Sequence, residues 1–554
     1  MNKKLEVTFR DGEVLEFEEG TTFKTISEHF QKYYKYDILV AKVDNEIVDL
    51  NNKLTKNCKI DFFDRSSELG NSTYSRTLRL MLVYAVFNLY GHKTKMTIQF
   101  SMDNGFYCTI DNMDITTEEL DKITAELNRI IESNYEIEKT TVSRLDAIKY
   151  LNMYGKTDKV NMLKYISNTY ISLYRIGEYY DYFYGRMAYS TGQINSFKLN
   201  YINSNGFVLS FPTLKEPERT RDYVHYEKLF NKFIEYTKWS NKAYIKNAAD
   251  LNFVVSQAKS VELINIVEAF YNNQIFMTSE EIYKKKDTVK IVLIAGPSSS
   301  GKTTTAKKLD IYLKTKGFHT YPIEVDNYYL DIDKRAKDEN GELDFESLDA
   351  IDVDLFNDNL SRLLKGEEVE LPKYNFVKGK REYNGNVLKL GSNDIIIIEG
   401  LHALNDKLTE SIDQSKKYKI YISPLVTINL DDYNYVHTTD VRKLRRIVRD
   451  SKTRGYNASE TLNRWSSISA GEYQNIFGFQ ETADAIINST LLYEMGILKT
   501  YAEPLLFNMS EDDPQYPEAM RLINILRNFL PIPSDDVPKD SILREFIGGS
   551  CFED

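Results

Sequence analysis

Residues 296–305 read GPSSSGKTTT, a spacing that is typical of phosphate-binding loops. The two glycines permit backbone angles that a Cβ would forbid, so that successive N–H groups can face an anion. The ammonium of Lys302 can neutralise phosphate oxygens, and the hydroxyl of Thr303 can bind Mg²⁺. The pattern therefore predicts an ATP site with Mg²⁺ as cofactor. No motif that reads the donor base is visible, so GTP stays open as the donor. The predicted nucleotide-binding residues are Gly296, Pro297, Ser298, Ser299, Ser300, Gly301, Lys302, Thr303 and Thr304.

Two carboxylates end apolar runs that read as strands beside this loop. Glu399 closes NDIIIIE, where an acidic residue can hold the metal of a nucleotide site together with Thr303. Asp326 closes a second predicted strand, in TYPIEVD. Ligands of open α/β sheets bind outside the carboxyl ends of the strands, so Asp326 is placed to take a proton from an acceptor hydroxyl. We predict Asp326 and Lys302 as catalytic residues and Thr303 and Glu399 as metal ligands.

The motifs behind the loop follow a fixed order: VDNYYLD, DFESLDAIDVDLF, LPKYNFVKGKR, IIIIEGLHALN and TDVRKLRRIVRDSKTRG. Through them residues 286–490 resemble the uridine kinase and phosphoribulokinase family. The resemblance implies transfer of a phosphoryl group from ATP to the 5′-hydroxyl of a uridine-like nucleoside. It also implies that Asp344 holds ribose hydroxyls and that Tyr374 and Phe376 wall the base pocket.

Cations recur through residues 442–454, where a solvated helix face or a nucleic-acid patch would be the ordinary interpretation. The family resemblance instead implies a lid that closes over substrate and phosphates and excludes water. On that interpretation Arg442 contacts the substrate, and Arg445 and Arg449 belong to the lid.

The sequence departs from the family on the side that recognises the base. The family histidine that reads the pyrimidine edge has no counterpart, because its place falls at or near Gly379. The acceptor therefore stays open between a nucleoside, a non-nucleoside sugar and a sugar phosphate.

The front of the chain is predicted to hold two further units. Residues 4–63 alternate as two strands, a helix and more strands, and resemble the ubiquitin-like TGS module of threonyl-tRNA synthetases and some GTPases. Residues 71–215 resemble the second additional domain of those synthetases, whose editing site uses an HxxxH and a CxxxH pair. The matching positions carry apolar or phenolic side chains, which cannot hold a metal or a hydrolytic water as those ligands do. These positions are Leu80, Tyr84, Phe183 and Met187.

The predicted fold class is multidomain, α/β and α+β. We expect a TGS-like β-grasp unit over residues 1–64 and a synthetase editing-like α+β unit over 65–224. A helical connector over 225–285 would lead into a P-loop kinase unit over 286–554, with a parallel sheet in three layers.

The net charge of −11 argues against a chain that coats nucleic acid or an anionic membrane. Three cysteines without paired spacing, and no predicted signal peptide or membrane span, favour a cytoplasmic protein.

The front units motivate a second hypothesis, a nucleotide-sensing protein that contacts RNA or the ribosome. Assembly into a homo-oligomer and the role of the tail DSILREFIGGSCFED stay open.

Overall fold

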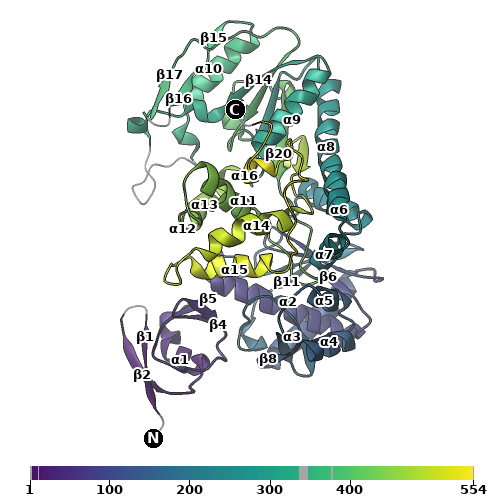
Figure 1. Cartoon of the computed structure of the whole chain (residues 1–554), viewed down its shortest axis with the longest axis vertical. Coiled ribbons are helices and arrows are strands. Elements are labelled where there is room, and N and C mark those ends of the chain that lie inside the picture. Colours follow the sequence, from purple (N-terminus) through teal and green to yellow (C-terminus); the bar gives the residue numbers. More distant parts are fainter. Residues whose placement is uncertain (1–2, 10–11, 336–346, 376–377, 553–554) are drawn as a thin grey trace.

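The computed structural model describes residues 3–9, 12–335, 347–375 and 378–552. Figure 1 shows the first two units at one end of the molecule and, at the other, the parallel sheet that carries the phosphate-binding loop. Across the described ranges every helix is too short or too polar to cross a lipid bilayer.

The first unit is a five-stranded sheet crossed by one helix. Its elements are β1 (Lys4–Phe9), β2 (Val14–Glu18), α1 (Phe23–Phe30), β3 (Ile38–Val43), β4 (Glu46–Val48) and β5 (Cys58–Asp64). The strand order is β2-β1-β5-β3-β4, with β1 parallel to β5 in the middle. The α1 helix buries Phe23, Ile26 and Phe30 in the core on this sheet. The order of two strands, a helix and further strands that the sequence predicts is present.

The second unit combines a long buried helix with two antiparallel sheets, ordered β11-β12-β7-β6 and β10-β9-β8. Its helices are α2 (Glu68–Tyr90), α3 (Thr117–Glu132), α4 (Arg144–Met153) and α5 (Thr157–Leu163). Its strands are β6 (Met96–Met102), β7 (Gly105–Ile110), β8 (Ile137–Ser143), β9 (Tyr170–Ile176), β10 (Tyr179–Asp181), β11 (Lys198–Asn203) and β12 (Gly206–Ser210). The helix and strands expected over residues 71–110 are thus observed.

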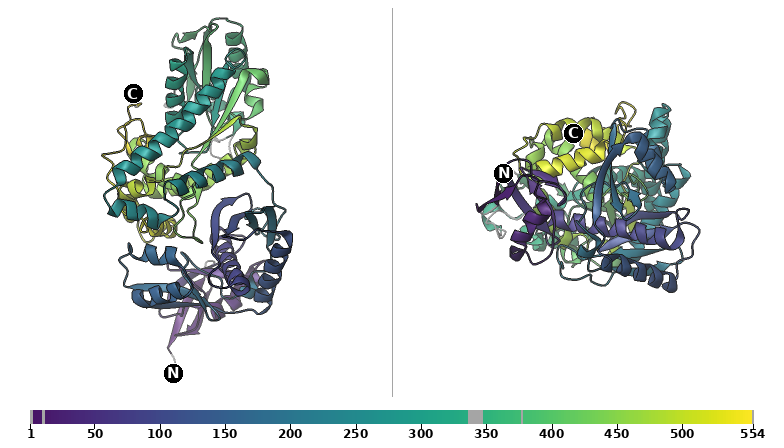
Figure 2. Two further views of the ribbon diagram at one scale, coloured as in Figure 1. Left: turned by 90° about the vertical axis from the view of Figure 1, so that its right-hand side faces the viewer. Right: turned by 90° about the horizontal axis from the view of Figure 1, so that it is seen from below.

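The connector consists of helices, as expected: α6 (Glu227–Lys242), α7 (Ala248–Ser256) and α8 (Ser260–Lys284). It is more than a spacer. Leu263, Ile264 and Val267 of α8 belong to the same core as the parallel sheet that follows. The long α8 runs beside the helix after the phosphate-binding loop; Figure 1 labels both, and Figure 2 shows the molecule from two further sides.

The part of the chain after the connector, from residue 286 on, is called the kinase-like region. It is built on five parallel strands. They are β13 (Ile291–Ala295), β14 (His319–Glu324), β19 (Asp394–Glu399), β20 (Lys417–Ser423) and β21 (Ala485–Asn488). Their order is β14-β19-β13-β20-β21. Such strands are buried on both faces and therefore read as continuous apolar runs.

Two cores lie on opposite faces of this sheet. Val292 and Ile294 of β13 pack with α8 and with α9 (Lys302–Thr315). Ile291 and Leu293 pack on the other side with α6 and with α10 (Val353–Leu364). Helices therefore cover both faces, which gives the three layers that the sequence predicts.

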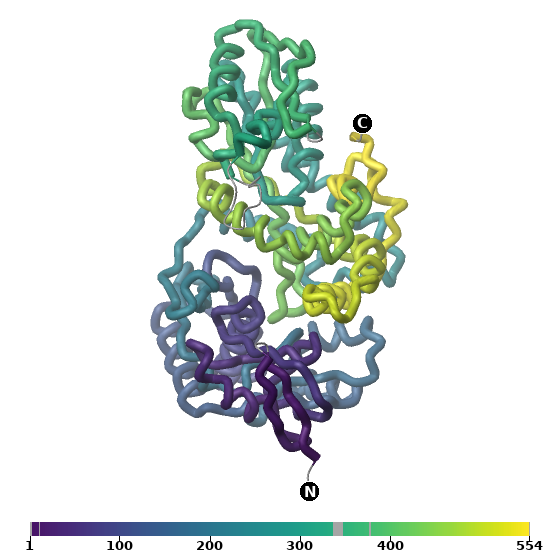
Figure 3. Tube along the Cα trace, turned by 90° about the vertical axis from the view of Figure 1, so that its left-hand side faces the viewer, coloured from purple at the N-terminus to yellow at the C-terminus, as the bar shows by residue number. Residues whose placement is uncertain are grey.

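The remaining elements of this region are short paired strands and a set of helices. Two small antiparallel sheets pair β15 (Val369–Glu370) with β18 (Val387–Leu388) and β16 (Lys373–Asn375) with β17 (Lys380–Glu382), and the second pair lies between β15 and β18 in the chain. The later helices are α11 (Thr438–Thr453), α12 (Ala458–Asn463), α13 (Trp465–Asn475), α14 (Glu494–Phe507), α15 (Tyr516–Leu526) and α16 (Arg544–Ile547). The C-terminal segment, residues 534–552, runs back along the kinase-like region, and Figure 3 shows it in yellow.

Candidate active site

The turn between β13 and α9 has the backbone that a phosphate cradle requires. A Cβ on Gly296 would lie 2.0 Å from the carbonyl oxygen of Ile422, so only glycine fits there. Gly301 has a φ of 86° and Ser299 a φ of 59°, both in the left-handed region. These angles turn the chain sharply before α9 begins, so that N–H groups at the start of the helix face outward.

Lys302, Thr303 and Glu399 meet at the carboxyl end of the sheet. The parallel register pairs Ile294 with Glu399, and the Thr303 hydroxyl donates a hydrogen bond of 3.0 Å to Glu399 Oε1. Lys302 Nζ donates to the carbonyl of Pro297 at 3.2 Å. Burial raises the pKa of Glu399 to about 7, and the charge of Lys302 opposes the rise. The two predicted metal ligands are therefore adjacent.

Asp326 lies at the end of the neighbouring strand, in a 3₁₀ turn over Val325–Tyr328. Desolvation by the surrounding protein raises the pKa of its carboxyl, and Lys302 opposes this effect electrostatically. The two predicted catalytic residues are therefore close enough for their charges to interact.

An aromatic group adjoins Asp326. The next residue, Asn327, accepts a hydrogen bond of 3.1 Å from the N–H of Tyr374, which fixes β16 against the turn. The rings of Tyr329 and Tyr374 have centroids 5.8 Å apart. The Arg335 guanidinium lies 4.5 Å from the first centroid and 4.9 Å from the second. The predicted Asp344 and Phe376 lie outside the described residues.

The arginines of α11 contact the cradle itself. Arg442 Nε donates to the carbonyl of Ser298 at 2.8 Å, and Arg446 Nη1 donates to the hydroxyl of Ser298 at 2.5 Å. Arg449 pairs with Asp450 at 3.3 Å. Arg442 and Arg446 therefore pack against the loop at Ser298.

Arg445 requires a correction to the lid interpretation. Its side chain is fully buried and donates to Glu494 at 2.8 Å and to the carbonyl of Ser489 at 2.7 Å. A cation with these partners cannot swing over a substrate without leaving a buried carboxylate unpaired. Arg445 is a structural support beneath the loop, which also reaches the carbonyl of Ser299 at 3.3 Å.

Two carboxylates that the sequence analysis missed bind the cradle. Glu472 of α13 accepts a hydrogen bond of 2.6 Å from the N–H of Ser298 and also pairs with Arg442. Glu545 of α16 accepts from the N–H of Thr304 at 3.3 Å and from its hydroxyl at 2.8 Å. Neither glutamate belongs to a recognisable motif. The unexplained tail DSILREFIGGSCFED holds Glu545, whereas Glu472 has no such signal in the sequence.

These contacts test whether the loop fits a phosphate ligand. Carboxylate oxygens already bind N–H groups at both ends of the cradle, so the loop accepts anionic oxygen atoms. Among the described residues no three His, Cys, Asp or Glu side chains cluster as a metal cage. Thr303 and Glu399 would supply the protein ligands of Mg²⁺, with phosphate oxygens and water completing its shell, which is its common mode of binding.

The positions that match the synthetase editing ligands form part of an apolar core. Leu80, Phe183 and Met187 are at most 3% exposed. Tyr433, from the loop between β20 and α11, is buried in the same core and stacks on Phe183. A side chain of the kinase-like region therefore occupies this part of the second unit.

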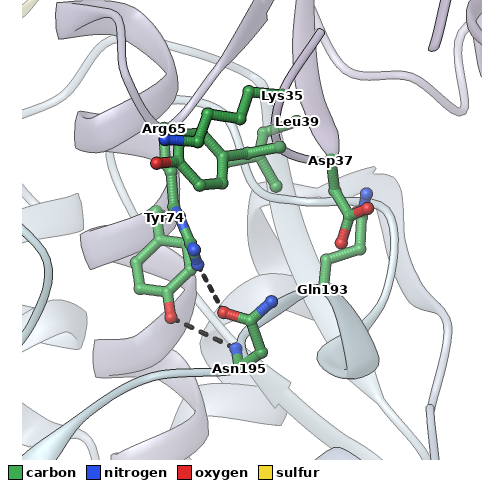
Figure 4. A pocket seen from close by; sticks show the side chains of 8 residues that line it. Lys35, Asp37, Leu39, Arg65, Tyr74, Gln193 and Asn195 are labelled. Atoms are coloured by element: carbon green, nitrogen blue, oxygen red, sulfur yellow. Dashed lines mark hydrogen bonds between the residues drawn. The ribbon is translucent and has the colours of Figure 1, made fainter. Parts of the chain in front are cut away.

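A separate pocket of about 130 Å³ lies between the first and second units. Lys35, Tyr36, Arg65 and Tyr74 contribute to its lining, and Figure 4 shows Asn195 donating to the Tyr74 hydroxyl. None of the predicted site residues lines it.

Comparison with known proteins identifies the region that holds the loop. Residues 291–492 match the model of the Phosphoribulokinase / Uridine kinase family. This part of the chain is therefore similar to that family. The resemblance that the sequence motifs predict is confirmed, and we call residues 291–492 the kinase-family region.

The N-terminal part is similar to threonine–tRNA ligases. Identity is 31% over 197 residues with the ligase of Acetivibrio thermocellus and 33% over 197 residues with that of Clostridium botulinum strain Kyoto. Each match covers 35% of this chain and 31% of the ligase. The chain thus spans about a third of the length of these curated relatives.

Among solved structures, a possible uridine kinase from Bacillus stearothermophilus is 23% identical, with a TM-score of 0.23, and the match covers 27% of this chain and 79% of that one. The D-glycerate 3-kinase of Cryptococcus neoformans is 15% identical, with a TM-score of 0.20, and the match covers 49% and 89%. At these TM-scores the two likenesses say nothing about the chemistry of this chain.

Proposed function

We propose that the chain is an ATP- and Mg²⁺-dependent kinase that phosphorylates the 5′-hydroxyl of a uridine-like nucleoside to the monophosphate. The observation that supports this most directly is the meeting of Lys302, Asp326 and the Thr303–Glu399 pair at the carboxyl ends of β13, β14 and β19. The family match of residues 291–492 supports the same class of reaction.

In this proposal Asp326 orients the acceptor hydroxyl and takes its proton. The hydroxyl oxygen forms the new bond to the γ-phosphorus, while the bond from that phosphorus to the β–γ bridging oxygen breaks and ADP leaves. Lys302 offsets the charge on the phosphoryl oxygens. When bound, Mg²⁺ neutralises charge between the β- and γ-phosphates, and Thr303 and Glu399 would hold it.

The surroundings of Asp326 bear on the acceptor class. The rings of Tyr329 and Tyr374 offer apolar faces that suit a flat base. The buried guanidinium of Arg335 beside them suits an anionic group, and it favours a sugar phosphate as the second candidate acceptor.

A different class of function is supported by the front of the chain. The similarity to threonine–tRNA ligases, together with the cations and aromatic rings of the pocket in Figure 4, supports RNA contact as an alternative role for residues 3–224.

The test is acceptor-dependent formation of ADP from Mg-ATP, with uridine, cytidine, adenosine, guanosine, ribose and ribulose 5-phosphate as acceptors. We expect turnover with a pyrimidine nucleoside that is lost in Lys302→Ala and Asp326→Asn. Asp333→Asn is the matched control, because Asp333 is an exposed carboxylate in the next turn. Turnover with ribulose 5-phosphate alone would select the sugar-phosphate candidate. No turnover with any acceptor, in a folded protein that binds ATP, would contradict the kinase proposal.

A further inference from the structure

The C-terminal segment reaches the phosphate cradle through one side chain. The carboxylate of Glu545 accepts hydrogen bonds from the N–H and the hydroxyl of Thr304, at 3.3 and 2.8 Å. Thr304 follows Lys302 and Thr303 in the first turn of α9. A carboxylate oxygen therefore accepts a hydrogen bond from a donor group that the loop motif assigns to a phosphate.

The rest of the segment holds Glu545 in this place. Ile542 packs against the cradle, because a Cβ on Gly301 would lie 3.4 Å from its Cδ1 atom. Ser541 donates to Glu268 at 2.5 Å, and Asp540 pairs with Lys308 at 3.0 Å. Ile542, Leu543, Phe546 and Ile547 are at most 2% exposed. The backbone on both sides of Glu545 is thus part of the core.

Glu545 also adds negative charge to a site that is proposed to bind a polyanion. Burial lowers the pKa of Lys302, and nearby carboxylates oppose that shift. Those carboxylates are Glu399, Glu545 and Glu472, in decreasing order of effect. Glu399 has a proposed role with the metal and Glu472 is neutralised by Arg442. Within the described ranges Glu545 forms no ion pair as close as that of Glu472, and its charge acts over a longer distance on Lys302 and Arg449. Its hydrogen bonds go to Thr304 of the cradle.

We propose that Glu545 competes with the phosphates of the donor nucleotide for Thr304 and thereby sets the affinity of the site. The inference rests on the proposed nucleotide site. Nucleotide binding requires only that the half-buried Glu545 side chain turn away from α9, while the buried residues beside it keep the segment in place. The affinity of the wild-type site is therefore weaker than its cradle alone would give.

The experiment measures the Kd of ATP, ADP and inorganic pyrophosphate by calorimetry on the full-length chain. Glu545→Gln keeps the shape of the side chain and removes its charge, so we expect all three to bind roughly tenfold more tightly. Asp540→Asn is the matched control. Asp540 lies in the same segment, but its carboxylate pairs with Lys308 and does not touch the cradle. The Kd of this variant for each of the three probes should therefore equal that of the wild type.

The outcomes separate the inference from the proposed function. If the wild type binds ATP and Glu545→Gln binds it no more tightly, the competition is overturned while the nucleotide site stands. If neither binds any of the three probes, both are overturned. Should Glu545→Gln fail to fold, Glu545→Asp shortens the side chain by one methylene and draws the carboxylate away from Thr304, and tighter binding is again the expected result.

Discussion

The ring of Phe183 stacks on the ring of Tyr433, with centroids 6.0 Å apart and planes inclined by 13°. Phe183 belongs to the second unit and Tyr433 to the kinase-family region. Lys156 donates a hydrogen bond to the Tyr433 hydroxyl, and Arg79 donates to its carbonyl at 3.1 Å. The second unit therefore holds a loop of the kinase-family region through one buried tyrosine, which makes polar contacts at its hydroxyl and at its backbone carbonyl.

The loop that contains Tyr433 is connected to the phosphate cradle by the elements on both sides of it in the chain. Before it, β20 ends beside Gly296, which has no room for a Cβ because of Ile422. After it, α11 places Arg442 on Ser298. The position of the second unit is therefore linked to the geometry of the cradle through a short stretch of chain.

Tyr433→Ala should destabilise the protein strongly. Tyr433 is 3% exposed, and truncation of a buried aromatic side chain costs about 3–5 kcal/mol in the free energy of unfolding. Tyr433→Phe keeps the stacked ring and removes only the partner of Lys156, so it should cost about 1–2 kcal/mol. Denaturant unfolding measures both. Tyr170→Ala, at a tyrosine that is 67% exposed, is the control, and equal stability of Tyr433→Ala and this control would contradict the packing role.

Gly296→Ala should disrupt the cradle. The added Cβ would lie 2.0 Å from the carbonyl oxygen of Ile422, and a backbone atom in a central strand cannot easily move away. We expect a loss of about 1–3 kcal/mol in stability and at least roughly tenfold weaker ATP binding. Thermal unfolding and calorimetry measure the two effects. A Cβ on Gly478 meets no atom within 4 Å, so Gly478→Ala should leave both unchanged. Full ATP affinity in Gly296→Ala would show that the loop adapts.

The elements of the cradle could be predicted because their determinants are local. The apolar strand, the glycines and the following helix are contiguous in sequence. Each of these patterns indicates its own local structure without help from distant residues. The meeting of Thr303 with Glu399 followed from the rule that ligands bind at the carboxyl ends of parallel strands.

The orientation of the α11 arginines could not be predicted in the same way. Helical spacing places Arg442, Arg445 and Arg449 near one another, yet their roles depend on partners from distant segments. Glu494 buries Arg445, and Glu472 pairs with Arg442. The contact of Glu545 with Thr304 likewise joins residues 241 positions apart, and no local pattern reports such packing.

Arg445→Ala separates a structural role from a lid role. Removing the guanidinium leaves the buried carboxylate of Glu494 without its partner, so we expect a loss of about 3–5 kcal/mol in the free energy of unfolding. Arg454→Ala is the control, because Arg454 is 47% exposed and pairs with Asp450 at 3.6 Å, and it should change stability by less than about 1 kcal/mol. Urea unfolding measures both. A stable Arg445→Ala protein that lost only turnover would restore the lid interpretation.

The stability of the ligand-free protein should depend on Glu399 as pH changes. Burial raises the pKa of Glu399 to about 7, above its ordinary value of 4.5. Between these two values the folded state binds more protons than the unfolded state, so stability falls as pH rises through this window. After allowance for partial exposure, we expect Glu399 to contribute a loss of about 2 kcal/mol that is absent in Glu399→Gln. Denaturant unfolding of both proteins at about pH 5 and about pH 8 measures the difference, and parallel pH profiles would contradict it.

The same ionisation should govern the metal. Mg²⁺ requires the ionised carboxylate, so its apparent affinity in the presence of ATP should rise with pH up to about 7 and then level off. Below that pH the affinity should fall by up to roughly tenfold per unit, since each bound ion must displace one proton. Titration of Mg²⁺ at a series of pH values measures this dependence. In Glu399→Gln the affinity should be weaker and should lose this pH dependence, because the amide does not titrate. A variant that kept the wild-type pH profile would place the titrating ligand elsewhere.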